Sequence, residues 1–336
     1  MKSYCRFAGA VFLLALLGAE ARPIPWVKLP DLASESDVVV LGGIVSAVQV
    51  GVTSIQLEGE EAPSRARVMV GDLHVQEIWK GTPDTSDITV RYDLPDDPIG
   101  YATPPVGTSA FFFLKQAGQE YRFTSPYRPA IDGMPGAMPE GGTLPERLAV
   151  RMSAMAESME TSSYQKLQAV YALGEIPSAA STEALQAVSK LSDPLPQLNA
   201  VAELLLRGDT SGLGTAVDAL LNPAVRRSSV ATAGLLIGIT QGVKDPQAVP
   251  TLVTLLERGD EQARRAAASA LMHTASPSAT DALVRALDDP DGQVRYYAVV
   301  GLADITGKAD WRPSPLGFRE REAIYLGYWK GWAGAR

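Results

Sequence analysis

The sequence predicts a multidomain β + α protein, in which a small N-terminal β domain precedes an α-solenoid of paired helices. Between Tyr164 and Thr306, two apolar helices separated by a short break recur with a period of about 30 residues, which is typical of helical repeat arrays. Ahead of this array, residues 26–128 are rich in β-branched residues and alternate between apolar and polar positions, which predicts strands. The chain of 336 residues is long enough for two such domains.

Residues 1–21 are predicted to be a signal peptide. Lys2 and Arg6 precede the apolar run Phe7–Leu17, and Ala19-Glu20-Ala21 fits a small-residue cleavage site. An uncleaved N-terminal anchor is the alternative. We therefore expect an exported protein, periplasmic or extracellular, with no membrane insertion after signal cleavage.

The only cysteine, Cys5, lies inside the predicted signal peptide. The mature chain would then have no thiol, which excludes disulfides and cysteine-based metal or nucleophile sites. The net charge is −8 and the basic residues do not cluster, so no nucleic-acid partner is expected.

Five short strands are expected between residues 26 and 128, separated by turns and a Pro-rich loop at Leu94–Pro105. Short strands joined by long loops fit a small closed barrel or a sandwich. The predicted strands are Val38–Gln49, Arg67–Lys80, Ile88–Asp93, Thr108–Lys115 and Tyr121–Thr124.

Three stretches of this region carry a family resemblance: SDVVVLGGIV from Ser36, HVQEIWKG from His74 and GTSAFFFL from Gly107. They resemble the netrin-like, tissue-inhibitor-of-metalloproteinase-like OB barrel found in many exported bacterial proteins. The resemblance implies an OB-like fold and raises a protease-inhibitor-like role. Eukaryotic inhibitors of this type present an N-terminal cysteine to the protease zinc, and that mode does not transfer to a mature chain without cysteine.

Residues 129–146 are predicted to be a Pro/Gly linker that ends at the start of a helix. Thr143 and Glu146 form a capping box, and the helix is expected to continue to about Glu160. Met152, Met155 and Met159 recur at helical spacing and are expected to pack as core.

The solenoid is predicted over residues 147–310. Asp245-Pro246 and Ser276-Pro277 are expected to open second helices, each as an N-cap followed by a first-turn proline. The stretch DPDGQVRYYAVVGL from Asp289 resembles HEAT repeats, in the short bacterial form similar to those of phycobilin-lyase-type proteins. The predicted helix pairs fall near 163–191, 195–221, 224–257 and 260–288, with a last helix near 291–306.

Residues 311–336 are predicted to be an aromatic C-terminal capping helix. Phe318, Tyr325, Trp329 and Trp332 lie on one helix face, which suits a segment that covers the last repeat. An aromatic binding stripe is the alternative interpretation.

No catalytic, cofactor-binding or metal site is predicted. The two histidines, His74 and His273, lie in different predicted domains, and no phosphate-binding loop or serine-nucleophile motif occurs. The carboxylates Asp288, Asp289 and Asp291 come at a helix start, where capping explains acidic residues; a calcium site is the alternative.

Basic residues recur at one position of the repeats, at Lys166, Arg264 and Arg295. One interpretation is a ladder, in which each basic group hydrogen-bonds an acidic residue or a carbonyl at the next repeat junction. The other is a basic strip for an acidic partner. The pair Arg226-Arg227 fits either interpretation. Arg226, Arg227, Arg264 and Arg295 are therefore the candidate partner-binding residues.

These features predict an exported non-catalytic protein-binding or scaffold protein that uses its HEAT-repeat surfaces to bind another protein. The working surface would be formed by second helices, within residues 181–191, 246–257 and 278–288. Two alternatives remain: an enzyme or lyase-like accessory subunit with a pocket on the concave face, and the protease-inhibitor-like role of the β domain.

Overall fold

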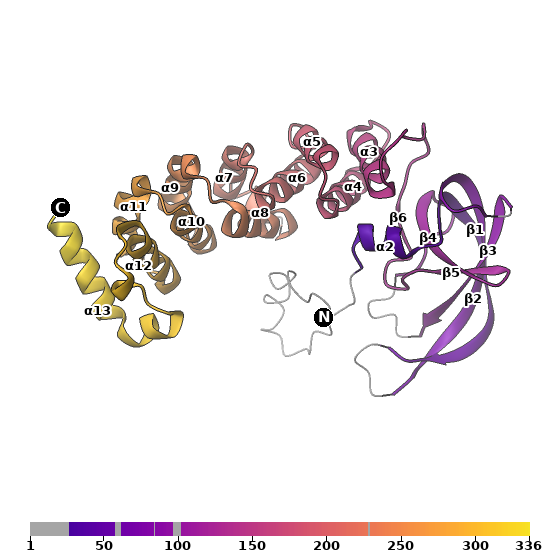
Figure 1. The fold of residues 1–336 in the computed structure, drawn as a ribbon, viewed down its shortest axis with the longest axis horizontal. Coiled ribbons are helices and arrows are strands. Elements are labelled where there is room, and N and C mark those ends of the chain that lie inside the picture. The colour runs from indigo at the N-terminus through magenta and orange to yellow at the C-terminus, as the bar shows by residue number, and fades with distance from the viewer. Residues whose placement is uncertain (1–26, 58–61, 84, 97–101, 228) are drawn as a thin grey trace. The chain divides into compact units, whose positions relative to one another are not determined.

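The computed structural model describes residues 27–57, 62–83, 85–96, 102–227 and 229–336 (Figure 1). The predicted signal peptide, with Cys5, lies outside the described residues. The chain forms two compact units, Met1–Ala184 and Leu185–Arg336, called here the N-terminal unit and the helical unit. Within the described part of the chain, no helix combines the length and the apolar character needed to cross a membrane.

The N-terminal unit contains one six-stranded sheet in the order β1-β2-β3-β5-β4-β6. β1 pairs antiparallel with β2 along its length and with β4 through Val38–Gly42. β3 and β5 meet in parallel at the pair Val90 and Tyr121. The strands are β1 (Val38–Ile55), β2 (Ser64–Lys80), β3 (Asp87–Pro95), β4 (Ala110–Ala117), β5 (Glu120–Phe123) and β6 (Ala130–Asp132).

Each of the five predicted strands is present, and β1 and β2 run several residues longer than predicted. β6 was not expected, because its three residues lie in the stretch predicted as a linker and are too few to show a period. It pairs antiparallel with β4, between Ala110–Phe112 and Ala130–Asp132. A short helix, α2 (Leu29–Glu35), also precedes β1 inside the range predicted as all β.

β4 is buried on both faces, which explains its unbroken apolar run. Phe112 and Leu114 belong to a core cluster with Ile44 and Val90. Phe111 points to the opposite side of the sheet, because successive strand residues alternate. There its ring meets Trp79 edge-on, with ring centroids 4.9 Å apart.

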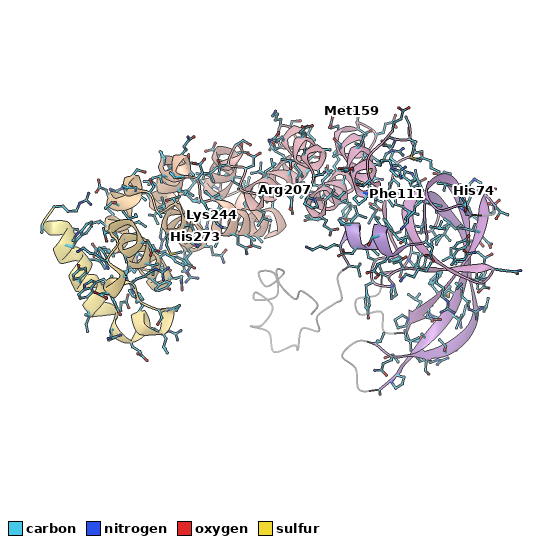
Figure 2. All side chains as sticks on the ribbon, in the orientation of Figure 1. His74, Phe111, Met159, Arg207, Lys244 and His273 are labelled. Carbon is cyan, nitrogen blue, oxygen red and sulfur yellow. The ribbon has the colours of Figure 1, made fainter. Side chains whose placement is uncertain are left out.

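Among the described residues, two helices follow the sheet within the N-terminal unit, and a third, α5 (Ala179–Val188), spans its boundary. α3 (Leu144–Glu157) begins with the predicted capping box of Thr143 and Glu146, and α4 (Ser163–Glu175) begins with a second box at Ser162 and Gln165. Met152 and Met155 are buried as expected. The prediction for Met159 is wrong: its side chain is 95% exposed, because α3 ends before it (Figure 2).

The helical unit consists of helices in two rows (Figure 1). α6, α8, α10 and α12 contact one another in succession, and α7 contacts α9 in the second row. η3 (Pro246–Ala248) and η4 (Pro277–Ala279) lead into α9 and α11, as the Asp-Pro and Ser-Pro pairs predicted. The helices are α6 (Pro194–Leu206), α7 (Leu213–Leu221), α8 (Ser229–Gly242), α9 (Val249–Arg258), α10 (Glu261–Thr274), α11 (Thr280–Ala286), α12 (Gly292–Thr306) and α13 (Pro315–Gly334).

The aromatic residues of α13 pack into the core of this unit. Phe318, Tyr325 and Trp329 are buried in it, and Trp332 packs against it half-buried. Trp311 stacks on Tyr328 with ring centroids 3.5 Å apart. Packing therefore accounts for the aromatic spacing of this helix.

Candidate functional site

The recurring arginines of the helical unit join one helix pair to the next. Arg264 of α10 donates two hydrogen bonds to the Asp289 carboxylate, 2.8 Å from Nε and 3.1 Å from Nη2. Arg295 of α12 donates to Glu322 of α13 at 2.6 Å and to the carbonyls of Asp289 and Pro290 at 2.7 and 3.0 Å. Both arginine side chains are partly buried, and these contacts confirm the ladder interpretation for Arg264 and Arg295.

The other two candidate arginines differ from this pair. Arg226 is exposed and forms an ion pair with Asp260, the N-cap of α10. The side chain of Arg227 lies outside the described residues. Partner binding by Arg226, Arg227, Arg264 and Arg295 stays a prediction.

Sequence reasoning missed a second row of this ladder, one residue further along α10. Arg265 forms two hydrogen bonds with Asp291, at 3.0 and 2.6 Å. Asp291 also caps α12 by accepting from the N–H groups of Gln293 and Val294. The Arg265 hydrogen bond, followed by these backbone donors, holds the pKa of Asp291 below its usual value against the opposing effect of burial. The sequence did carry one signal for this second link, because Arg265 directly follows Arg264.

Each of the three carboxylates for which a calcium site was the alternative interpretation has a basic partner. Asp289 binds Arg264, Asp291 binds Arg265, and Asp288 pairs with Lys330 of α13. Across the described residues, no three His, Cys, Asp or Glu side chains are grouped so as to hold a metal ion.

Exposed charges gather on the second helices and continue onto α13. Glu257 of α9 accepts from Arg285 of α11 at 2.7 Å, and Asp281 of α11 lies 3.3 Å from Arg336. We call the exposed residues Glu257, Asp281, Arg285 and Asp288 the second-helix face. It falls within the predicted ranges 246–257 and 278–288. The third range, 181–191, crosses the boundary between the two units.

A family model of HEAT repeats matches residues 214–303. The match begins in α7 and ends in α12, so it includes both rows of helices and the Arg264 and Arg265 links. No curated protein matches the chain. HEAT repeats commonly present protein-binding surfaces, because stacked helix pairs form extended faces.

The two histidines have different surroundings. Exposed His74 of β2 lies 2.8 Å from the Asp87 carboxylate, measured from Nδ1. Burial, followed by the nearby charge of Lys244, lowers the pKa of His273 in α10 despite the opposing charge of Asp304 (Figure 2). His74 belongs to the N-terminal unit and His273 to the helical unit.

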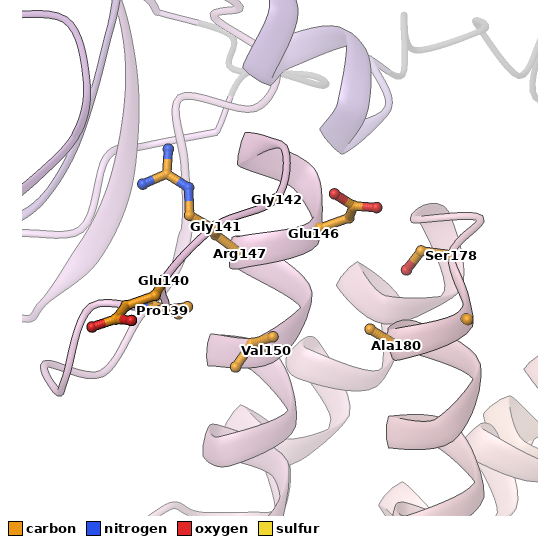
Figure 3. Close-up of a pocket in the computed structure, with 10 residues that line it drawn as sticks. Pro139, Glu140, Gly141, Gly142, Glu146, Arg147, Val150, Ser178 and Ala180 are labelled. Atoms are coloured by element: carbon orange, nitrogen blue, oxygen red, sulfur yellow. The ribbon is translucent and has the colours of Figure 1, made fainter.

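A pocket of about 330 Å³ lies in the N-terminal unit (Figure 3). Two of its charged side chains already have structural roles: Glu146 completes the capping box of α3, and Arg147 donates to the Trp79 carbonyl at 3.0 Å. The lining residues are Pro139, Glu140, Gly141, Gly142, Glu146, Arg147, Val150, Ser178, Ala179 and Ala180.

In the described part of the N-terminal unit, sequence reasoning also missed two buried ion pairs. Arg151 of α3 binds Glu77 of β2, and Arg128 binds Glu175 of α4 at 2.6 Å. Glu175 also accepts from the N–H of Leu29, at the start of α2, at 2.8 Å. One signal was available: Arg151 lies on the helix face that carries Leu148, Met152 and Met155, where a charge needs a partner.

Proposed function

We propose that this chain is an exported, non-catalytic protein that binds another protein through the second-helix face of its HEAT repeats. The observation that carries the proposal is the row of exposed charges on α9 and α11, within the residues that the HEAT model matches.

The charges of this face are available for exchange with a partner. Glu257 and Arg285 pair in solvent, where an ion pair contributes between about 0 and 1 kcal/mol. Replacing such a pair by contacts with another protein therefore costs little. Arg264 and Arg295, in contrast, are committed to links within the array, and their loss would disturb the stacking of the repeats.

We assign the β domain a supporting role, as a second recognition module or docking base, and propose that its sheet is a closed netrin-like OB barrel. The pairing of β1 with both β2 and β4, together with the contact of β3 with β5, supports closure. Because OB barrels have many functions, this fold does not identify a ligand. Export rests on residues 1–21, and N-terminal sequencing of protein from the envelope fraction should begin at Arg22.

The binding face is tested by crosslinking and mass spectrometry in the native envelope. The double variant Glu257→Arg/Arg285→Glu keeps an ion pair at this position but inverts its direction on the surface. It should lose the crosslinked partner while keeping the wild-type circular dichroism spectrum. The matched control Arg319→Glu/Glu320→Arg inverts two exposed charges of α13 and should keep the partner. Equal recovery with both variants would refute the proposed face.

A further inference from the structure

β1 has a long edge on which, among the described residues, no other strand pairs. β4 covers β1 only from Val38 to Gly42, and one bridge joins Ile44 to Val106. Beyond this point β1 continues to Ile55 and pairs with β2 alone. A free strand edge carries unpaired N–H and C=O groups and is a template for a further strand.

This edge lacks two of the features that usually prevent association. The segment Val45–Ile55 contains no charged residue and no proline. It is also apolar and exposed: Val48, Val50 and Val52 are 56%, 53% and 50% exposed. Exposed apolar side chains grouped in this way mark interaction sites more often than isolated ones do.

The described charges beside the edge are also balanced. On β2, one strand back, Arg65 and Arg67 both approach Asp96, at 3.7 and 3.8 Å, and the Asp72 carboxylate accepts a hydrogen bond from Ser46 of β1 at 2.7 Å. The edge thus offers nothing that would select a partner by opposite charge, and two identical edges can approach without repulsion. A second copy of the chain meets these conditions, and twofold pairing is the commonest form of self-association.

A register for the pair follows from the bulges of β1. The register with β2 is regular over Ser46–Gln49, shifts between Gln49 and Gly51, and is regular again over the longer run Gly51–Ile55. A run without a shift keeps the side chains of facing residues on the same side of a continued sheet, and the longer run offers more residue pairs. Thr53 is its middle residue, so a twofold axis there pairs all five residues, with Thr53 opposite itself and Val52 opposite Ser54 of the second copy.

We infer that the β1 edge pairs antiparallel with the same edge of a second copy, through residues 51–55 centred on Thr53. The product is a continuous sheet across both copies, with β2 of each copy flanking the central pair. Three of the five residues, Val52, Thr53 and Ile55, are β-branched, which favours packing on a pleated surface. A contact of five residues per copy gives a weak dimer whose population rises with protein concentration.

Two charge variants of equal size test both the interface and its register by sedimentation velocity of the full chain. In Val52→Lys/Ser54→Lys, like charges face each other twice across the axis, and the dimer should be lost. In Val52→Lys/Ser54→Glu, each lysine faces a glutamate of the second copy. This variant should dimerise at the same protein concentration as the wild type or at a lower one.

Val150→Lys is the matched control, because Val150 is an exposed valine of α3 in the same unit, away from the edge. It should leave association unchanged, and circular dichroism should show all variants folded. A wild-type chain that stays monomeric from micromolar to millimolar concentration would overturn the inference. So would equal behaviour of the two double variants, or a monomer that instead captures an added uncharged strand peptide.

Discussion

Arg151 of α3 and Glu77 of β2 form a two-pronged ion pair, with both Nη–Oε distances at 3.1 Å. The Arg151 side chain is only 3% exposed and also donates to the carbonyls of Met134, Gly136 and Ala137. Its guanidinium lies over the Trp79 ring, 5.0 Å from the centroid. One side chain thus connects the sheet, the first helix and the chain segment that joins them.

Replacing Arg151 should destabilise the N-terminal unit strongly. Arg151→Met leaves Glu77 without its cation and three carbonyls without a donor, a loss of about 3–5 kcal/mol for a buried pair. The control Arg147→Met, one turn earlier on α3, removes a hydrogen bond to the Trp79 carbonyl and a weak one to the Met138 sulfur, and should cost about 1 kcal/mol. Urea denaturation followed by tryptophan fluorescence compares the two, and equal costs would contradict the role given to Arg151.

Acid should weaken the same contact. Burial raises the pKa of Glu77, but hydrogen bonds from Arg151, the Gly136 N–H and the Trp79 indole outweigh burial and hold it below the usual value. The contribution of Glu77 to stability is therefore complete above the unfolded-state pKa and is lost as the pH falls through the folded-state pKa.

Glu77→Gln should therefore be less stable than wild type at neutral pH, with the difference shrinking as the solution is acidified. Denaturation midpoints across the acidic range measure this trend. Glu160→Gln changes an exposed glutamate of the same unit and should show little difference at any pH. A gap for Glu77→Gln that stays constant with pH would show that the charge of Glu77 does not contribute.

Local signals in the sequence were enough to place most helices and strands. They did not show which residues far apart in the sequence would pair. The capping box of Thr143 and Glu146 and the prolines after Asp245 and Ser276 act within one turn, so their residues identify helix starts directly. Arg151 and Glu77 are 74 residues apart, and nothing in the sequence around either residue identifies the other as its partner. The arginine ladder lies between these cases: its period was readable, but the identity of its acceptors depended on how the repeats stack.

The close packing of α6 and α8 depends on glycines spaced four residues apart on α8, at Gly234, Gly238 and Gly242. A Cβ at Gly242 would lie 1.6 Å from the Leu205 carbonyl oxygen, and one at Gly238 would lie 2.9 Å from that of Ala202. Gly238→Ala should cost about 1–3 kcal/mol, as overpacking usually does, and Gly242→Ala should cost more.

Gly214→Ala provides the control for this prediction, because no atom lies within 4 Å of a Cβ there. Alanine favours the helix by up to about 1 kcal/mol over glycine, so this variant of α7 should be neutral or slightly stabilised. Thermal unfolding followed by circular dichroism gives the order. Destabilisation of equal size at Gly214 and Gly238 would show that helix propensity, not the contact with α6, determines the effect.

Two helix ends of the solenoid use the same left-handed backbone with different residues. Ala275 follows α10 with φ of 46°, and Gly307 follows α12 with φ of 68°. A side chain in this conformation costs about 1–2 kcal/mol, whereas glycine adopts it freely. Ala275→Gly should therefore stabilise the helical unit and Gly307→Ala should destabilise it, each by about 1 kcal/mol. A Cβ at Gly307 meets no atom within 4 Å, so its effect isolates the backbone cost, and shifts of the same sign in thermal unfolding would disprove the assignment.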